Sequence, residues 1–83
     1  MNDKLTEIRK LIVEFKDIND EEIQLESDMS GELALDSADR VELALSVEDK
    51  YDISISPEEH SECETIKDLI DLINLKITKK MEV

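Results

Sequence analysis

The sequence predicts an all-α protein, a small four-helix bundle with three longer helices, one short helix and a long loop between the first two helices. The 83 residues include one glycine and one proline, too few turn residues for a sandwich or barrel of many short strands. Ala, Leu, Ile, Glu and Lys are abundant, and these residues favour helices. The length fits one domain, residues 1–83.

The first predicted helix covers residues 3–16. Its apolar residues recur at steps of three and four and so share one helical face: Leu5, Ile8, Leu11, Ile12 and Phe15. Residues 17–31 have no sustained period, and we expect an ordered loop anchored by Ile23, Leu25 and Met29. A connection of roughly 15 residues is longer than most, and such loops are more often functional than idle.

The second predicted helix begins after Asp36 and ends near Tyr51. Asp36 is a favoured N-cap residue, and Asp39 follows three positions later in the first turn. We expect this helix to turn an apolar face inward and to leave its acidic side chains in solvent. The residues expected inside are Val41, Ala44, Leu45, Val47 and Tyr51, and those expected in solvent are Asp39, Glu42, Glu48 and Asp49.

Two further helices complete the predicted bundle. Ile53, Ser54 and Ile55 alternate like a strand, but a single three-residue strand has no partner here, so we expect an extended connection with buried isoleucines. The run Ser56-Pro57-Glu58-Glu59 has the pattern of a capping box with its preferred proline and starts the short helix. Thr65 caps the last helix, with apolar positions Ile66, Leu69, Ile70, Ile73 and Ile77.

Negative charge is concentrated in the middle of the chain. Residues 17–64 hold 17 of the 23 acidic residues and only two basic ones, Arg40 and Lys50, so this segment sums to −15 within a net charge of −13. A protein that binds nucleic acid by neutralising phosphates needs a basic face, so that function is excluded. Basic protein partners fit this charge better, although an acidic run is also an ordinary way to keep a surface solvated.

The sequence also argues against membranes and catalysis. No apolar run approaches the roughly 20 residues that span a bilayer, and the N-terminus has no stretch like a signal peptide. Together with the lone Cys63 this predicts a cytoplasmic protein. The motifs GxGxxG, GxxxxGK[ST], CxxC and HExxH are missing. We therefore expect no catalytic residues and no dedicated metal site.

Two weaker patterns are interpreted as structural. His60 and Cys63 lie three residues apart, but no defined Asn or Asp orients them as a catalytic pair. We expect His60 on the surface and Cys63 in the core. The acids from residue 17 to 28 resemble a calcium loop only superficially, because Glu22 and Asp28 stand where an EF-hand needs Gly and Glu.

Ser37 is the one residue whose position indicates a functional site, the attachment point of a phosphate group. It would stand exposed in the first turn of the second helix, between Asp36 and Asp39, with no base to activate it as a nucleophile. A phosphate joined to its hydroxyl would lie beside the N–H groups at the positive end of the helix dipole, which favour an anion. The alternative is that Ser37 merely helps to cap the helix.

The residues around Ser37 resemble the signature of acyl carrier proteins, in which Asp-Ser-Leu-Asp opens the second helix. Here Asp36-Ser37 is followed by Asp39, and then come Val41-Glu42-Leu43, Val47-Glu48-Asp49 and Tyr51-Asp52-Ile53. The resemblance extends over residues 3–77, where further matching positions are Ile23, Met29, Leu33, Ile55, Thr65 and Ile66.

The resemblance implies that residues 1–83 form a single acyl carrier domain that is not an enzyme. A phosphopantetheinyl transferase would attach 4′-phosphopantetheine from coenzyme A to Ser37. Acyl groups held as thioesters would then reach enzymes of fatty-acid, polyketide or related lipid biosynthesis. By position, recognition falls to five acids that would meet basic patches on acyl-transferring and acyl-modifying enzymes: Asp36, Asp39, Glu42, Glu48 and Asp49. We expect a monomer.

Departures from the signature favour a specialised carrier. Ala34 stands where the family usually has Gly. Ala38 follows the serine, where the family usually has a Leu that contacts the transferase and partner enzymes. Two alternatives remain. One is an acidic helical adaptor that binds a basic partner and is never modified. The other is a peptidyl carrier domain. That family tends to have a pair of glycines in this motif, and the run Leu35-Asp36-Ser37 lacks it.

Overall fold

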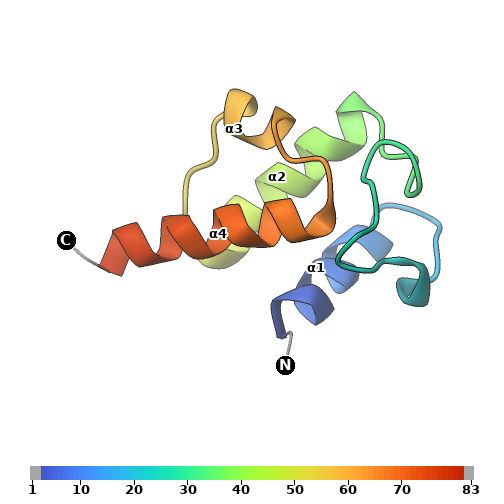
Figure 1. The fold of residues 1–83 in the computed structure, drawn as a ribbon, viewed down its shortest axis with the longest axis horizontal. Helices are drawn as coiled ribbons and strands as arrows, with labels where there is room; N and C mark the ends of the chain where they lie inside the picture. The colour runs from blue at the N-terminus through green and yellow to red at the C-terminus, as the bar shows by residue number, and fades with distance from the viewer. Residues whose placement is uncertain (1–2, 82–83) are drawn as a thin grey trace.

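The computed structural model describes residues 3–81 and is drawn in Figure 1. Its elements are α1 (Asp3–Val13), the 3-10 helix η1 (Asp20–Glu22), α2 (Ser37–Tyr51), α3 (Pro57–Ser61) and α4 (Ile66–Met81). Pairing of the β type within residues 3–81 is limited to an isolated bridge between Asp28 and Thr65. The predicted all-α bundle of three longer helices and one short helix is confirmed. Across the same residues, no helix is long and apolar enough to cross a membrane.

Helix α1 ends at Val13, three residues before the predicted end. The N–H groups of Phe15 and Lys16 both bond to the carbonyl of Ile12, at 3.1 and 2.9 Å, so the chain leaves the helix through a tight turn. Ile8 and Ile12 are fully buried on the predicted face.

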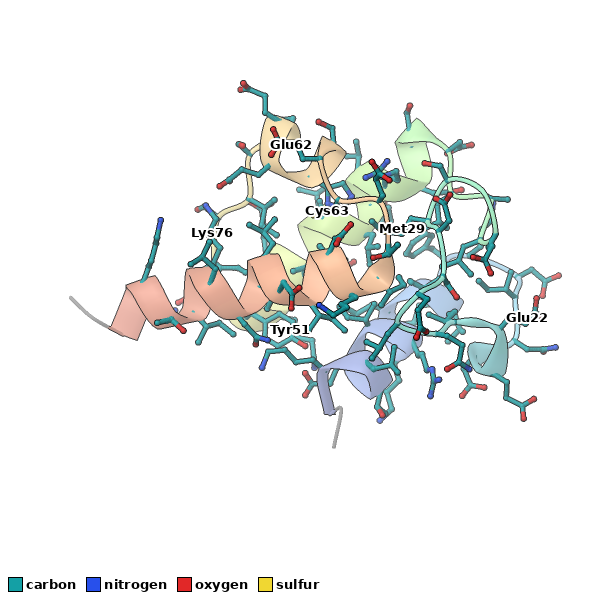
Figure 2. All side chains as sticks on the ribbon, in the orientation of Figure 1. Glu22, Met29, Tyr51, Glu62, Cys63 and Lys76 are labelled. Carbon is teal, nitrogen blue, oxygen red and sulfur yellow. The ribbon has the colours of Figure 1, made fainter. Side chains whose placement is uncertain are left out.

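The loop between α1 and α2 contributes to the core. The expected anchors Ile23 and Met29 are fully buried, and Leu25 packs against the core in a partly buried position. The N–H of Met29 bonds to the carbonyl of Glu64 at 2.9 Å. Figure 1 shows this loop at the end of the molecule where α4 begins, and Figure 2 shows Met29 and Cys63 in the same region. The loop is therefore ordered, as predicted, and it fixes the position where α2 starts.

Ala34 adopts a backbone conformation that L-residues disfavour. Its φ is 54°, in the left-handed region. Leu33 and Leu35 on either side are both buried, and the N–H of Leu35 bonds to the carbonyl of Met29 at 2.8 Å. The chain bends at Ala34 to bury both leucines, so the usual Gly of the related family would relieve strain here.

Helix α2 buries the predicted face only in part: Val47 is buried and Tyr51 packs against the core as expected, but two other predicted residues are not buried. Leu43 and Val47 are fully buried, whereas Val41 and Leu45 are 59% and 57% exposed. The prediction that Val41 and Leu45 face inward is wrong. Residues 43 and 47 lie one turn apart on the side that meets the core. Residues 41 and 45 lie on another side, which the five-residue α3 leaves partly open.

Helix α3 and the start of α4 have the predicted caps. The Ser56 hydroxyl accepts the N–H of Glu59 at 3.1 Å. The Thr65 hydroxyl accepts the N–H of Asp68 at 3.2 Å. The connection before α3 is extended, with Ile55 buried and Ile53 partly buried.

His60 corrects another prediction. It is 6% exposed, so the expectation of a surface residue is wrong, whereas Cys63 is buried as expected. Since α3 has only five residues and His60 is the one that it buries, the imidazole occupies the place of an apolar core side chain. Helix α3 is also tied to α4 by the ion pair of Glu59 with Lys76, 2.8 Å apart. Lys76 is labelled in Figure 2.

Candidate functional site

Ser37 is the first residue of α2, and its neighbours form the cap of this helix. The carboxylate of Asp36 accepts the N–H of Asp39 at 2.8 Å. In return, the carboxylate of Asp39 accepts the N–H of Asp36 at 3.2 Å. The predicted N-cap is confirmed, and because Asp36 fills it, the exposed Ser37 is not needed for capping.

The backbone around Ser37 can accept an anion. The first hydrogen bond of the helical ladder joins the N–H of Arg40 to the carbonyl of Asp36 at 2.9 Å. The N–H groups of Ser37 and Ala38 precede this bond and point out of the helix end. With the helix dipole they form an electropositive position next to the Ser37 hydroxyl.

Lys16 offsets the acidity beside Ser37. Its Nζ lies 3.0 Å from Oδ2 of Asp39, and both side chains are partly buried. The hydrogen bond from Lys16, followed by that from the Asp36 backbone, lowers the pKa of Asp39 below its usual value. The carboxylate is therefore ionised, but its charge is largely compensated within the molecule.

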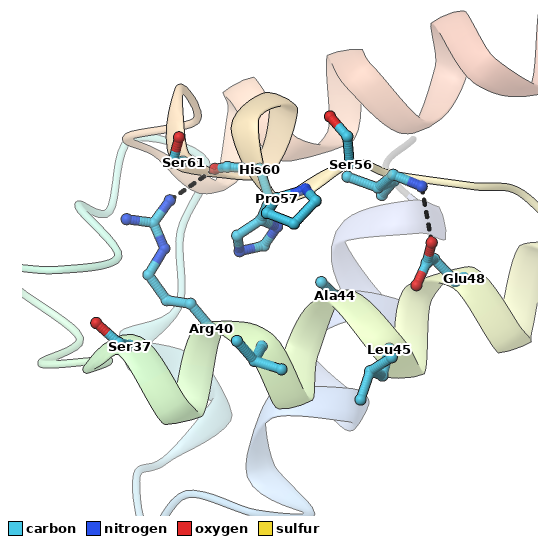
Figure 3. A pocket seen from close by; sticks show the side chains of 11 residues that line it. Ser37, Arg40, Ala44, Leu45, Glu48, Ser56, Pro57, His60 and Ser61 are labelled. Carbon is cyan, nitrogen blue, oxygen red and sulfur yellow. Dashed lines mark hydrogen bonds between the residues drawn. The ribbon is translucent and has the colours of Figure 1, made fainter.

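An open groove starts at Ser37 and runs between α2 and α3 (Figure 3). Its volume is about 290 Å³. Most of its surface is apolar, supplied by Val41, Ala44, Leu45, Ile55 and Pro57. Val41 and Leu45 are thus exposed because they line this groove, which places an apolar channel directly beside the exposed hydroxyl.

Arg40 and His60 also line the groove, and this was not predicted from the sequence. Nη2 of Arg40 donates to the carbonyls of His60, at 2.8 Å, and Cys63, at 2.6 Å, so Arg40 joins α2 to the end of α3. Burial, and then the nearby Arg40 charge, lower the pKa of His60. The imidazole is therefore neutral near pH 7. An isolated arginine within a strongly acidic segment was the available sequence signal.

The pair formed by His60 and Cys63 does not have the properties of a nucleophile and its base. Cys63 is buried, and burial raises the pKa of its thiol. Its Sγ lies 3.6 Å from the carbonyl oxygen of Glu59. A protonated, buried thiol is a poor nucleophile, which agrees with the interpretation of Cys63 as a core residue.

The five acids predicted to bind partners differ in their surroundings. Glu42 and Asp49 are exposed on α2, and neither side chain has a hydrogen bond or ion pair within residues 3–81. Asp36 and Asp39 form the helix cap, and Asp39 is partly buried, so the expectation that it faces solvent is wrong. Glu48 is partly buried, and its Oε2 accepts the N–H of Ile55 at 2.8 Å (Figure 3), so the expectation that it faces solvent is wrong. The role of these acids in recognition stays a prediction.

Comparison with known proteins gives an independent result. A family model described as "phosphopantetheine attachment site" matches residues 6–73, which include most of α1, all of α2 and α3, the groove and Ser37. Comparison with individual curated proteins gave no significant match. The matched span covers most of the chain, and the family is defined by covalently attached 4′-phosphopantetheine. The chain therefore belongs to the phosphopantetheine-binding family and is a carrier protein of the acyl or peptidyl carrier type.

Proposed function

We propose that Ser37 carries 4′-phosphopantetheine and that the chain delivers acyl intermediates to enzymes of fatty-acid, polyketide or related lipid biosynthesis. The observation that carries this proposal is the exposed Ser37 hydroxyl at the start of α2, where it opens onto the apolar groove. When bound, the group supplies a terminal thiol that forms thioesters with acyl groups.

The other serines at the groove are less suitable for attachment. The hydroxyl of Ser56 caps α3 by accepting the N–H of Glu59. The hydroxyl of Ser61 donates to the carbonyl of Glu58 at 2.8 Å. Ser37 combines exposure, a helix N-terminus that favours phosphate and direct access to the groove, and no other serine among residues 3–81 combines all three.

The surroundings of Ser37 fit a phosphodiester. The N–H groups of Ser37 and Ala38 would face its oxygens. The cation of Arg40 lies one turn further along α2, and Lys16 forms an ion pair with Asp39, one of the two acids of the cap. The acidic character of this region therefore does not oppose phosphate at Ser37 as strongly as the sequence alone implies.

The groove favours an alkyl chain over an amino acid as cargo. Its apolar residues gain burial from a hydrocarbon chain. The ammonium group of an aminoacyl thioester would approach the positive charge of Arg40. This supports an acyl carrier over a peptidyl carrier domain.

Recognition is proposed to use the acidic surface of α2. Glu42 and Asp49 are exposed on α2 itself, Asp36 is exposed just before it, and the partly buried Asp39 and Glu48 add charge beside them. Such a surface attracts basic patches and gives fast, salt-sensitive association, which suits a carrier that visits successive enzymes. The phosphopantetheinyl transferase is the first of these partners, and a monomer acting in the cytoplasm belongs to the same proposal.

The test is the intact mass of the chain after incubation with coenzyme A and a phosphopantetheinyl transferase of broad specificity. We expect a gain equal to one phosphopantetheine group. Absence of that gain, under conditions in which a control carrier is fully modified, would contradict the proposal and favour the unmodified adaptor.

A further inference from the structure

Three buried nitrogen atoms at the groove have no hydrogen-bond partner within residues 3–81. They are Nε of Arg40 and both ring nitrogens of His60. His60 is 6% exposed and each of the three nitrogens exposes less than 1 Å², so bulk solvent does not reach them. In Figure 3 the His60 ring lies beside the Arg40 side chain, between α2 and α3. Buried polar groups in proteins are nearly always paired, so these atoms require an explanation.

The fold does not account for the imidazole. Leaving buried polar atoms unpaired costs free energy, and an apolar side chain of similar size would fill the same space without that cost. The neighbouring groove residues Ala44, Ile55 and Pro57 are apolar. If the groove held only a hydrocarbon chain, leucine at position 60 would serve as well as histidine.

The donors and acceptors of His60 and Arg40 limit which chemical groups can be their missing hydrogen-bond partner. A neutral imidazole has one N–H donor and one nitrogen acceptor, and Nε of Arg40 is a donor. The guanidinium is already fixed by its bonds to the carbonyls of His60 and Cys63, and Nη1 also lies 3.3 Å from the Ser30 hydroxyl.

A partner that can both accept and donate hydrogen bonds can pair with whichever ring nitrogen faces the groove. A carboxylate cannot donate to the imidazole acceptor, and an ammonium group is repelled by Arg40. A hydroxyl or a secondary amide satisfies both requirements.

We propose that His60, held beside the fixed guanidinium of Arg40, binds an uncharged hydroxyl or secondary amide of the molecule attached to Ser37. This inference rests on the proposed function. The same chemistry has two sources, the amide and hydroxyl groups of the phosphopantetheine arm and a hydroxyl on the acyl cargo. Each of the three nitrogens exposes less than 1 Å². Contact therefore requires the imidazole to turn about its Cβ–Cγ bond toward the groove, while Arg40 stays fixed by its carbonyl bonds.

His60 is the only histidine in the chain, so its ring signals can be assigned without ambiguity. The experiment records the ring ¹⁵N chemical shifts of His60 in the full chain in four forms. These are the unmodified chain, the chain with phosphopantetheine and a free thiol, and the octanoyl and 3-hydroxyoctanoyl thioesters.

If the arm is the partner, the ring shifts change on attachment of phosphopantetheine and stay changed with both cargoes. If the cargo is the partner, they change only in the 3-hydroxyoctanoyl form. Unchanged shifts in all four forms would overturn the inference, and so would equal changes with both thioesters but none with the free thiol, since an apolar contact explains that result.

A second measurement uses His60→Leu, which keeps an apolar side chain of similar size and removes both ring nitrogens. We expect the unmodified variant to be at least as heat-stable as the parent. In the parent, the form whose His60 shifts change should have a higher thermal midpoint than the unmodified chain. We expect His60→Leu to lose that rise. Ser61→Ala is the matched control, because this groove residue already has its own partner in Glu58. A full rise in His60→Leu would overturn the inference.

Intact mass distinguishes a failure of the proposed function from a failure of the inference about His60. A chain that takes up no phosphopantetheine contradicts the proposed function. A modified chain whose His60 signals never change contradicts only the inference about Arg40 and His60.

Discussion

Nζ of Lys16, just beyond α1, lies 3.0 Å from Oδ2 of Asp39, the same oxygen that accepts the N–H of Asp36 at the start of α2. One carboxylate oxygen thus joins the end of α1 to the cap that precedes Ser37. Asp39 is committed to the fold, and partners that read charge on α2 find it most freely at Glu42 and Asp49.

Reversing the charge at Glu42 should slow phosphopantetheine transfer without disturbing the fold. The side chain of Glu42 is exposed and makes no hydrogen bond within the described residues, so Glu42→Lys leaves the fold intact and replaces attraction of a basic partner by repulsion. We expect the transfer rate at low salt to fall about two- to tenfold. The deficit should shrink as salt rises, because salt also screens the advantage of the parent chain.

The matched control is Asp71→Lys, the same reversal on the exposed side of α4, where Asp71 pairs only with Lys67. Equal rates for the two variants at low salt would show that the acidic surface of α2 is solubilising and does not guide partners.

Removing the carboxylate of Glu48 should destabilise the chain. Its Oε2 accepts the N–H of Ile55, which is buried, so Glu48→Ala leaves that donor unpaired. We expect a loss of about 1 to 2 kcal/mol in urea unfolding. Asp49→Ala, at the next and exposed position, should change stability by less than about 0.5 kcal/mol. Equal effects would contradict a structural role for Glu48.

Ala34→Gly should stabilise the chain. Ala34 has a φ of 54°, which glycine adopts without steric penalty. We expect a gain of about 0.5 to 1 kcal/mol, measured from the denaturant midpoint. The control is Ala38→Gly in the first turn of α2, where the same change should destabilise. A loss of stability in Ala34→Gly would show that the bend at this position is not strained.

The stability of the unmodified chain should decrease as pH falls past the ordinary pKa of histidine, 6.5. Burial, reinforced by Arg40, lowers the pKa of His60 in the folded chain. Below pH 6.5 the unfolded chain binds a proton that the folded chain does not, and stability is lost until the folded pKa is reached. We would measure urea unfolding between about pH 8 and pH 5. His60→Leu should lack this part of the pH dependence. Identical profiles for parent and variant would show that His60 does not cause the loss of stability.

The fold was predictable because its determinants are local. The caps at Asp36, Ser56 and Thr65 are each made by side chains three residues apart, so sequence spacing specifies them. The apolar repeat of α4 is continuous, and its predicted residues Ile66, Leu69, Ile70 and Ile73 are buried. The loop anchors Ile23 and Met29 were also correct, because so few apolar residues occur in that segment.

The groove was not predictable in the same way, because it depends on how α2 and α3 pack. Val47 was predicted inside correctly, but helical periodicity alone does not say whether Leu43 or Val41 and Leu45 join it in the core, since α2 is apolar on more than one side. The burial of His60 likewise follows from the shortness of α3 and from the bond of Arg40 to its carbonyl, a contact across 20 residues. The position of Ser37 was predicted, because it follows directly from the cap at Asp36.

The most direct test of the account is peptide-level mass analysis of the chain after incubation with coenzyme A and a broad-specificity phosphopantetheinyl transferase, in parallel with Ser37→Ala. The account predicts phosphopantetheine on the peptide that contains Ser37 and no mass gain in the variant. Since Ser37 is exposed and Asp36 caps the helix, Ser37→Ala should keep its helical circular dichroism and change stability by less than about 0.5 kcal/mol. Phosphopantetheine on a folded Ser37→Ala chain, or on a different serine of the parent, would contradict the account.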